Sequence, residues 1–512
     1  MGTTPPGTGF GAGLGQFNRR TFITAIAGGV ALAACTRSPK SMPSAGIPTA
    51  AIAAGEAARP HTGRTVSATL APARADIDLG GIIARTLAYN STVPGPLIRA
   101  NVGDELAVTV KNGLDHPTSV HWHGVTLRCD MDGAAPVTPD IDAGRVFTYR
   151  FTVPRPGTYW AHPHTHDFDL DAGLYLPLLV DDPAEPAAYD AEWIVMLDDW
   201  TDGVGPSPRQ IFDGLRAMSD ERMSDMPTMS GMAGSSGMGG VGSSDLLGGD
   251  GGDVAYPYYL INGRVPLSPS TFSAKPGQRV RIRLINAGSD TAFRVALAGH
   301  RMTVTHTDGN PVTPTEVDAV LLGMGERYDV IITAGDGVFP LVAAAEGKDG
   351  LARALLSTGA GNAPDAAFRP PELKRRVGTV EMFSPSPAAA SPRTADVDLH
   401  VRLSGQMMPY DWLINGHHFD DTRPLRVRQG QQATITFDNT STMWHPMHLH
   451  GHVFQVMKPD GGAGPCKDTV IVLPRQKLTV VLAADNPGVW MLHCHNTYHI
   501  AAGMMTTLDY IT

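Results

Sequence analysis

Cysteine is scarce in this chain, because its 512 residues include only four. A scaffold held together by many disulfides is therefore excluded. Charge is also low, at 18% of residues against about 25% in an average globular protein. The net charge of −10 offers no basic surface for nucleic acid. Long helices are disfavoured, since 57 glycines and 41 prolines indicate many turns and short strands. What the chain does have is 19 histidines, and their positions must show whether they bind metal.

The N-terminus has the pattern of an export signal. The pair Arg19-Arg20 precedes an apolar run over residues 22–34. This run is too short to span about 30 Å of hydrocarbon but suits the core of a signal peptide. The arginine pair resembles a twin-arginine export signal. The run ends in Leu-Ala-Ala-Cys at Cys35, which resembles a bacterial lipobox.

These resemblances imply an exported lipoprotein. We expect cleavage of the signal peptide 1–34, lipid attachment to Cys35, and a flexible tether over residues 35–61, which are rich in Ser, Pro and Ala. The expected location is extracytoplasmic, with the lipid as the sole attachment to the cell membrane or envelope. An ordinary soluble signal peptide with an incidental cysteine is the alternative.

One pattern occurs three times in the rest of the chain, in residues 93–112, 260–286 and 413–439. Each copy has a turn, a second turn led by glycine, and a strand in which apolar and polar residues alternate. The three strands end at Asn112, Asn286 and Asn439. Alternation places one face of a strand on a core and the other in water. The repeat therefore predicts an all-β chain with three copies of one β-sandwich.

A second repeat joins the outer copies. Residues 156–164 align with residues 487–495, and in both the first histidine lies five positions after a glycine. The middle copy lacks these histidines, so we expect the outer domains to carry paired metal motifs and the middle one to be mainly structural. The predicted domains are 62–182, 183–365 and 366–512, with a Met-, Gly- and Ser-rich mobile insertion over 218–253 in the second.

The histidines gather in four clusters. They are His121-Trp122-His123, His162-Pro163-His164, the run from His445 through His448 and His450 to His452, and His493-Cys494-His495 followed by His499 and Met504. A His-x-His pair on a strand projects both rings from one face. Neutral imidazoles are good ligands for copper and zinc, so four such clusters in two related domains predict a metal centre.

The last cluster indicates copper. Two histidines, one cysteine and a weak axial methionine form a blue-copper electron-transfer site. Cys494, His499 and Met504 have suitable spacing, and His445 can supply the second imidazole. Zinc has no redox chemistry and would make poor use of a cysteine between two histidines.

These motifs, in this order, resemble the three-domain multicopper oxidases, which include laccases and bacterial copper-efflux oxidases. The resemblance covers essentially the whole mature chain. It implies three cupredoxin-like Greek-key β-sandwiches and four copper ions. The implied ligands are His445, Cys494, His499 and axial Met504 for type 1 copper, His121 and His448 for type 2, and His123, His162, His164, His450, His493 and His495 for the type 3 pair. His166 and His452 match no family ligand and are expected to support the ligands or lie at the surface.

The same resemblance implies a mechanism. A reductant gives single electrons to the type 1 copper, and Cys494 passes them through His493 and His495 to the other three ions, where O2 becomes two waters. Asp132 matches a carboxylate that the family often keeps near this cluster to supply protons, although a turn residue before Gly133 is an equal alternative. Ile500 stands where copper-efflux oxidases often have a glutamate, so the chain departs from the family pattern at that part of the proton relay.

The reductant is expected to be Cu(I), for copper detoxification. Thioethers select Cu(I), and six methionines fall in one short stretch at Met218, Met223, Met226, Met229, Met232 and Met238. The resemblance supports this, because copper-efflux oxidases carry a Met-rich insert near the blue site. Asp468 could orient a blue-site histidine or meet the donor cation, or be an ordinary strand-edge acid. An adaptable loop that happens to use methionine is the alternative for the stretch.

Other functions stay open. Laccase-type oxidation of phenols or aromatic amines is the main enzymatic alternative, with Fe(II) or Mn(II) oxidation behind it. A copper store or a structural sandwich protein is the non-enzymatic one, against which the complete ligand set argues. Cys129 and Cys466 fit no copper motif and could form a disulfide in an exported protein, if their Cα atoms lie within about 7 Å. We expect a monomer, since three domains suffice for a complete site.

Overall fold

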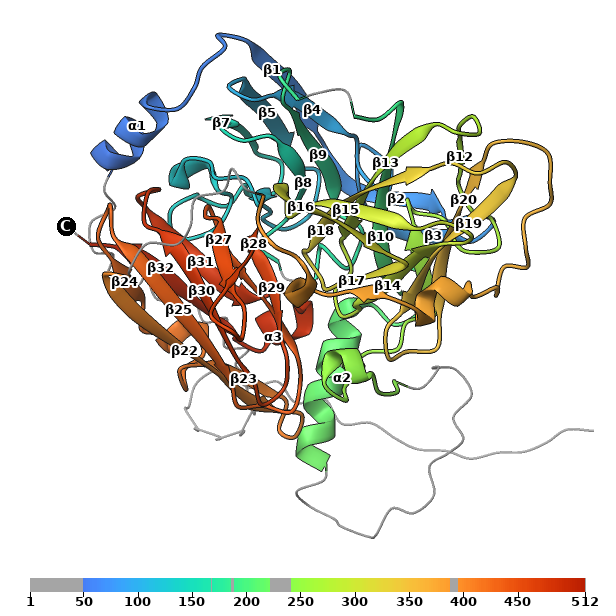
Figure 1. Cartoon of the computed structure of the whole chain (residues 1–512). Coiled ribbons are helices and arrows are strands. Elements are labelled where there is room, and N and C mark those ends of the chain that lie inside the picture. Colours follow the sequence, from blue (N-terminus) through green and yellow to red (C-terminus); the bar gives the residue numbers. More distant parts are fainter. Residues whose placement is uncertain (1–48, 167, 186–187, 222–240, 387–394, 512) are drawn as a thin grey trace, which may run out of the picture. The chain divides into compact units, whose positions relative to one another are not determined.

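Strands dominate the structure, which confirms the predicted all-β class. The computed structural model describes residues 49–166, 168–185, 188–221, 241–386 and 395–511 (Figure 1). Its helices are α1 (Thr49–Ala57), α2 (Pro208–Glu221) and α3 (Thr497–Ala501), with short 3-10 turns η1 (Cys129–Met131), η2 (Asp245–Leu247), η3 (Pro371–Lys374), η4 (Val380–Met382) and η5 (Phe419–Asp421). Within the described ranges, none of the helices has the length and apolar character to cross a membrane.

The strands form three consecutive groups along the chain, here called the first, middle and third groups. The first group holds β1 (Thr65–Leu70), β2 (Pro72–Asp78), β3 (Ile83–Tyr89), β4 (Ile98–Asn101), β5 (Glu105–Lys111), β6 (His121–His123), β7 (Val146–Thr152), β8 (Gly157–His162) and β9 (Leu176–Asp181). They make the sheets β1-β5-β7 and β4-β9-β8-β6 and the hairpin β2-β3.

The middle group has two six-stranded sheets, β11-β10-β13-β18-β15-β16 and β12-β20-β19-β14-β17-β21. Its strands are β10 (Ala191–Trp200), β11 (Tyr258–Ile261), β12 (Thr271–Ser273), β13 (Arg279–Asn286), β14 (Phe293–Leu297), β15 (Met302–Thr307), β16 (Asn310–Val317), β17 (Ala319–Leu322), β18 (Arg327–Thr333), β19 (Val338–Ala345), β20 (Leu351–Ser357) and β21 (Val377–Gly378). Although β21 lies beyond the boundary predicted after residue 365, it pairs with β17 of this group.

The third group has sheets of six and five strands, β23-β22-β25-β30-β27-β28 and β24-β32-β31-β26-β29. Its strands are β22 (Val397–Gln406), β23 (Asp411–Ile414), β24 (Leu425–Val427), β25 (Gln432–Asn439), β26 (His445–Leu449), β27 (Phe454–Met457), β28 (Ala463–Lys467), β29 (Thr469–Val472), β30 (Lys477–Ala483), β31 (Val489–Cys494) and β32 (Met505–Tyr510).

The sequence repeat is a structural repeat. Its strands β5, β13 and β25 each pair in parallel with the first strand of their group and antiparallel with a later one. The asparagine that ends each repeat is buried. Its side-chain amide donates to a carbonyl four or five residues on and to at least one carbonyl further along the chain. Its oxygen accepts the N–H two residues on, at 2.9 Å for Leu114, 2.9 Å for Gly288 and 3.0 Å for Ser441. An asparagine with this local bond fixes the turn that leaves the strand.

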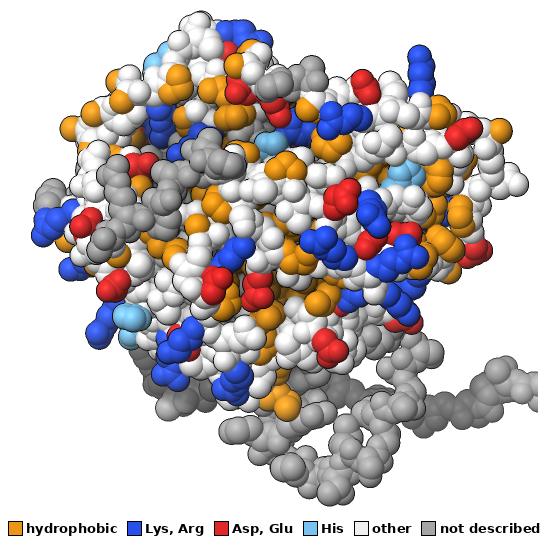
Figure 2. All heavy atoms as spheres, viewed as in Figure 1, with side chains coloured by type: hydrophobic (Ala, Val, Ile, Leu, Met, Phe, Trp, Pro, Cys, Tyr) orange, Lys and Arg blue, Asp and Glu red, His pale blue; other side chains and the backbone are white. Residues whose placement is uncertain are grey.

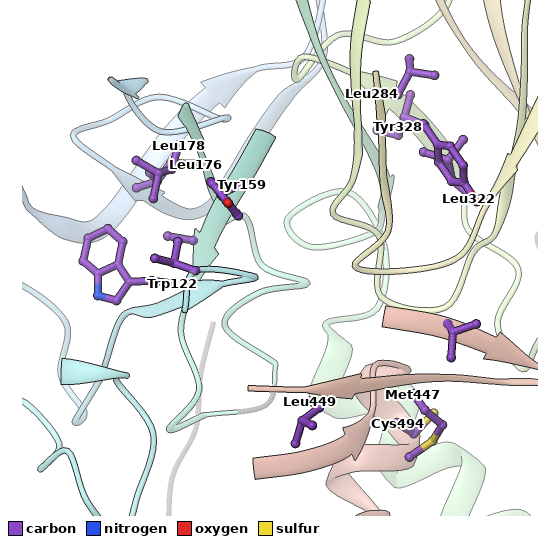
Figure 3. Packing of buried hydrophobic residues seen from close by; sticks show 14 of the residues in the cluster. Trp122, Tyr159, Leu176, Leu178, Leu284, Leu322, Tyr328, Met447, Leu449 and Cys494 are labelled. Atoms are coloured by element: carbon purple, nitrogen blue, oxygen red, sulfur yellow. The ribbon is translucent and has the colours of Figure 1, made fainter. Parts of the chain in front are cut away.

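One buried hydrophobic cluster draws side chains from all three groups. Figure 3 shows Trp122 and Leu178 of the first group, Leu284 and Tyr328 of the middle group and Leu449 of the third. On the face shown in Figure 2, acidic and basic side chains are interspersed, so charge of one sign does not dominate there.

The structure corrects two expectations about flexible segments. Residues 49–57 of the predicted tether form α1, because Ile52 is buried in the core and Glu56 accepts the Thr152 N–H at 2.8 Å. In the predicted insertion, residues 241–253 include η2, which Ser244 caps, and Leu247 is fully buried, although Gly242, Ser243 and Gly248 are exposed. The predicted signal peptide and Cys35 lie outside the described residues.

Candidate metal centre

The histidine motifs lie on neighbouring strands. In the first group β6 pairs with β8, which sets His121 opposite His162. In the third group β26 pairs with β31, which sets His448 opposite His493. Motifs far apart in sequence therefore meet because their strands share a ladder of hydrogen bonds.

Rings from the first and third groups face one another. His123 stacks on His448 with ring centroids 3.7 Å apart, and His121 stacks on His450 at 3.6 Å. The Nε2 atoms of His164 and His493 are 3.3 Å apart. Eight histidines meet in this region, here called the histidine centre: His121, His123, His162, His164, His448, His450, His493 and His495. All but the half-buried His164 are at most 3% exposed.

Hydrogen bonds fix the tautomers in this centre. The Nδ1 atoms of His121 and His448 donate to the carbonyl oxygens of Asp132 and Asp468, at 3.1 and 2.9 Å. His493 Nδ1 donates in the same way to the Cys494 carbonyl at 2.8 Å. A carbonyl oxygen only accepts, so Nδ1 carries the proton in each of these rings and Nε2 is the nitrogen whose lone pair can bind a metal.

Those lone pairs point at one another. His121 Nε2 and His448 Nε2 are 3.4 Å apart, and His450 Nε2 and His493 Nε2 are 3.0 Å apart. Two nitrogens bound tetrahedrally to one ion at about 2.0–2.1 Å would be about 3.3 Å apart. Two lone pairs that face each other at this distance need a positive ion between them. The donor set therefore fits a metal ion.

Unpaired nitrogens and pKa values agree with this fit. Among the described buried atoms without a hydrogen-bond partner are His123 Nδ1, His162 Nε2 and both ring nitrogens of His495. Burial lowers the pKa of His164 to about 3 and takes those of His123, His162, His450, His493 and His495 well below the ordinary value. These rings are therefore neutral at neutral pH, which is the form that binds a metal.

A second site surrounds Cys494, which is fully buried at the end of β31 and appears in Figure 3. Its Sγ is 3.6 Å from His445 Nδ1 and 3.5 Å from His499 Nδ1, and those two nitrogens are 3.1 Å apart. A thiolate and an imidazole on one tetrahedral ion would be about 3.5 Å apart. Met504 is fully buried nearby, and its backbone carbonyl accepts the Cys494 N–H at 3.2 Å.

Partners behind these histidines aim them at Cys494. His445 Nε2 lies 2.9 Å from the Ser441 hydroxyl, and His499 Nε2 lies 3.1 Å from Asp253 Oδ2. Both Nδ1 atoms are thereby left for a metal. The Asp253 carboxylate also accepts the Tyr410 hydroxyl at 2.5 Å. Sequence analysis missed Ser441 and Asp253, since neither stands in a recognisable motif.

Asp132 lies beside the histidine centre. Its Oδ2 accepts His450 Nδ1–H at 2.7 Å, and its Oδ1 is 3.2 Å from His121 Nδ1. The residue also ends the turn η1, and Gly133 after it has a φ of 79°. The contact and the turn, which stood as alternatives in the sequence, are both present.

Asp468 corrects a prediction. It is fully buried at the histidine centre, with Oδ1 3.2 Å from His123 Nε2, so it neither orients a blue-site histidine nor lies where it could meet a donor cation. It is no strand-edge surface acid either, because Arg327 pairs with both of its oxygens, at 2.6 and 2.7 Å. Arg327 lies 141 positions earlier in the sequence, and its contact with Asp468 could not be predicted from the sequence repeat.

The two remaining cysteines are free, so the disulfide considered for them is not formed. Cys129 is buried in η1, where its thiol contacts the Val489 backbone, while Cys466 lies on β28. The two histidines without a ligand role differ: His452 is buried and its Nε2 lies 2.7 Å from the Tyr510 hydroxyl, whereas His166 is exposed.

Only the start of the methionine-rich stretch falls in the described part of the chain. Met218 belongs to the last turns of α2. Met223, Met226, Met229, Met232 and Met238 lie outside the described residues. The base of α2 approaches the cysteine site, because Phe212 and Tyr410 have ring centroids 6.1 Å apart.

Comparisons with known proteins agree along the whole described chain. Three family models, each described as multicopper oxidase, match residues 74–185, 191–361 and 392–511. The chain is 62% identical to the multicopper oxidase MmcO of Mycobacterium tuberculosis, over 97% of each chain. It is 26% identical to copper resistance protein A of Escherichia coli, over 87% of this chain and 94% of that one. A solved multi-copper oxidase from Pseudomonas thermotolerans matches with a TM-score of 0.66 and 25% identity, over 87% of this chain and 99% of that one.

Proposed function

The chain belongs to the multicopper oxidases, and we propose that it oxidises Cu(I) outside the cytoplasm and passes the electrons to O2. Membership makes it a copper-dependent oxidoreductase with cupredoxin-like sandwiches. The observation that carries the proposal is the position of Cys494 between His493 and His495, which joins the cysteine site to the histidine centre through adjacent residues.

We assign four copper ions to these residues. Type 1 copper takes His445, Cys494, His499 and Met504, and type 2 copper takes His121 and His448. The type 3 pair takes His164, His450 and His493 on one ion and His123, His162 and His495 on the other. Two of these ligand groups, His445 with Cys494 and His499, and His164 with His450 and His493, have ligand atoms within 4.8 Å of one another. The second type 3 ion is supported by the unpaired ring nitrogens of His123, His162 and His495. Copper analysis of the loaded protein should give four ions per chain.

Bound copper would supply one-electron oxidation of the donor at the cysteine site and reduction of O2 to water at the histidine centre. The protein's own residues connect the cysteine site to the histidine centre. The Cys494 carbonyl accepts His493 Nδ1–H at 2.8 Å, so the thiolate residue and a centre ligand are linked by a hydrogen bond as well as by the chain. Asp132 accepts a hydrogen bond from His450 Nδ1–H. Its carboxylate therefore lies beside the histidine centre, where reduction of O2 to water would consume protons.

Contacts at the cysteine site support Cu(I) as the donor. Phe212 of α2 packs on Tyr410, Tyr410 donates to Asp253, and Asp253 contacts His499. The helix that leads into the methionine-rich stretch is thus connected to a type 1 ligand. Thioethers bind Cu(I) in preference to harder ions, so the methionines that follow this helix in the sequence suit Cu(I) as the donor.

Export, lipid attachment at Cys35 and a monomeric state remain part of this proposal. They rest on the sequence of the N-terminus and on the completeness of the two sites within one chain. The relatives named as copper resistance proteins support a role in copper detoxification. Relatives named as laccases support phenol oxidation as the second candidate.

The deciding experiment compares O2 uptake driven by Cu(I) with uptake driven by a phenol. One variant lacks residues 222–240, which leaves α2 intact, and a second replaces Met223, Met226, Met229, Met232 and Met238 by leucine. The leucine variant keeps the length and apolar character of the stretch and removes only the thioethers. We expect both variants to lose about tenfold of the Cu(I)-driven uptake and to retain the phenol-driven uptake. Unchanged Cu(I)-driven uptake in both would favour the laccase-type alternative.

A further inference from the structure

The middle group supplies none of the assigned copper ligands, yet one of its segments reaches the histidine centre. Residues 325–327 lead into β18. A Cβ added to Gly325 would lie 2.9 Å from His123 Cε1 and 2.9 Å from His495 Cδ2, so its backbone packs directly on those rings. Arg327, two residues on, is fully buried.

Arg327 binds all three strand groups. Its Nε donates to the Thr158 carbonyl of β8 at 3.0 Å, and one of its terminal nitrogens donates to the Gly325 carbonyl at 3.2 Å. Both terminal nitrogens bind Asp468 of the third group, at 2.6 and 2.7 Å. A planar guanidinium can make such a fork and a lysine ammonium cannot.

Asp468 and Thr469 carry this contact to two assigned ligands. The Thr469 hydroxyl donates to Asp468 Oδ1 at 2.9 Å and lies 3.0 Å from His123 Nε2 and 3.0 Å from His448 Nδ1. His448 Nδ1 also donates to the Asp468 carbonyl at 2.9 Å. These bonds leave His448 Nε2 and His123 Nδ1 as the nitrogens with a free lone pair, and His123 Nδ1 is unpaired in the structure.

The glycine after the first histidine motif makes room for the pair. Gly124 has a φ of 85°, and a Cβ there would lie 2.2 Å from Arg327 Nη2 and 2.6 Å from Asp468 Oδ2. A larger residue would displace the fork. The backbone of the motif is thus shaped around a side chain from a different strand group.

We infer that Arg327 is a positioning residue for the histidine centre: it orients Asp468 and Thr469 so that His448 and His123 present the correct nitrogens to type 2 and type 3 copper. Because Arg327 contacts all three groups, the retention of copper depends on how these groups pack together. This inference rests on the copper assignment proposed above.

The test compares two conservative substitutions of buried arginines. Arg327→Lys keeps the charge and loses the fork. Arg281→Lys is the matched control, since Arg281 is 3% exposed on the neighbouring strand β13 and pairs with Asp329 at 2.6 Å within the middle group. Each protein is loaded with copper and measured for copper per chain, blue absorption, the type 2 electron paramagnetic resonance signal and melting temperature.

We expect Arg327→Lys to keep its blue absorption while its affinity for type 2 copper falls about 10–100-fold, as is typical when the partners of metal-bound histidines are lost. Arg281→Lys should keep both signals. Thr469→Val removes only the bridging hydroxyl, and it should lower type 2 retention in the same direction even if Arg327→Lys fails to fold.

Two results would overturn the inference in different ways. A full type 2 signal in both Arg327→Lys and Thr469→Val, at wild-type copper concentrations, would show that the fork does not position the ligands. Absence of a type 2 signal from the loaded wild-type protein would instead reject the copper assignment, and with it the premise of the inference.

Discussion

The middle and third strand groups have the same architecture and different chemistry. Their second sheets share one strand order, β12-β20-β19-β14-β17 in the middle group and β24-β32-β31-β26-β29 in the third. Strand β14 pairs with β17 and β19 as β26 pairs with β29 and β31. The middle strands bury Phe293 and Leu341, whereas the third-group strands bury His445, His448 and Cys494.

This difference separates what folds the sandwich from what binds metal. The parallel strand pair and the asparagine turn occur in both groups, so neither depends on copper. Apolar side chains fill the space in the middle group that ligands occupy in the third. Function is therefore carried by a set of side chains placed on a sandwich whose strand order the middle group keeps without them.

The largest expected effect comes from removing Cys494, one of the side chains of the third group that the middle group lacks. Cys494→Ser should abolish blue absorption and O2 uptake with either donor, because the thiolate is both ligand and electron route. The cost in folding free energy should be about 1–3 kcal/mol, for a buried polar group left without a good partner. Visible spectra, O2 uptake and thermal denaturation measure the three quantities.

Cys466→Ser is the control for this substitution, since Cys466 is a half-buried free thiol of the same group. It should keep the blue colour and the activity. A Cys494→Ser protein that stayed blue would remove Cys494 from the type 1 site.

A smaller effect is expected at the contact between the first and third groups. Asp132→Asn keeps an oxygen that can accept His450 Nδ1–H and removes the charge. O2 uptake should slow by about 10–100-fold while blue absorption stays intact. Asp130→Asn, in the same turn but paired with Arg128 at 2.6 Å, should leave uptake unchanged. Equal rates for the two variants would restrict Asp132 to its role in the turn.

The smallest effect is expected at the asparagine turn, which the middle and third groups share. Asn286→Ala removes two side-chain contacts with carbonyls and Asn439→Ala removes three, and each should cost about 1–3 kcal/mol of folding free energy. Only Asn439→Ala should also alter the blue absorption, because Ser441 binds both Asn439 Oδ1, at 2.8 Å, and His445 Nε2, at 2.9 Å. A spectral change of equal size in Asn286→Ala would mean that the asparagine turn acts on the fold alone.

Much of the architecture could be predicted because it is local in sequence. Alternation along Arg279–Asn286 and Gln432–Asn439 identifies strands, and the recurring asparagine marks their ends. The His-x-His spacing places two rings on one strand face by geometry alone. Flexibility could not be predicted reliably from composition. Residues 49–57 have a linker-like sequence, yet they form α1, because Ile52 is buried against the core.

Residues that support the ligands could not be predicted in this way. Asp468 lies between β28 and β29, directly after Lys467, and its sequence suited an ordinary strand-edge acid equally well. Asp253 and Ser441 stand in Gly- and Ser-containing stretches with no periodicity. The role of Asp253 depends on a contact with His499, 246 positions later, whereas Ser441 contacts His445 only four positions on, through a turn whose shape the sequence pattern does not show.

The amino-acid sequence alone was enough to predict the all-β class, the threefold repeat, the family resemblance and the set of histidines and cysteine that can bind copper. These follow from strand periodicity and from ligand chemistry, which are properties of short segments. The free state of Cys129 and Cys466, the burial of Asp468 and the contacts of Arg327 with the three groups became visible in the three-dimensional structure. Such contacts depend on how the sandwiches pack, because hydrogen bonds between residues more than a hundred positions apart leave no periodic trace in the chain.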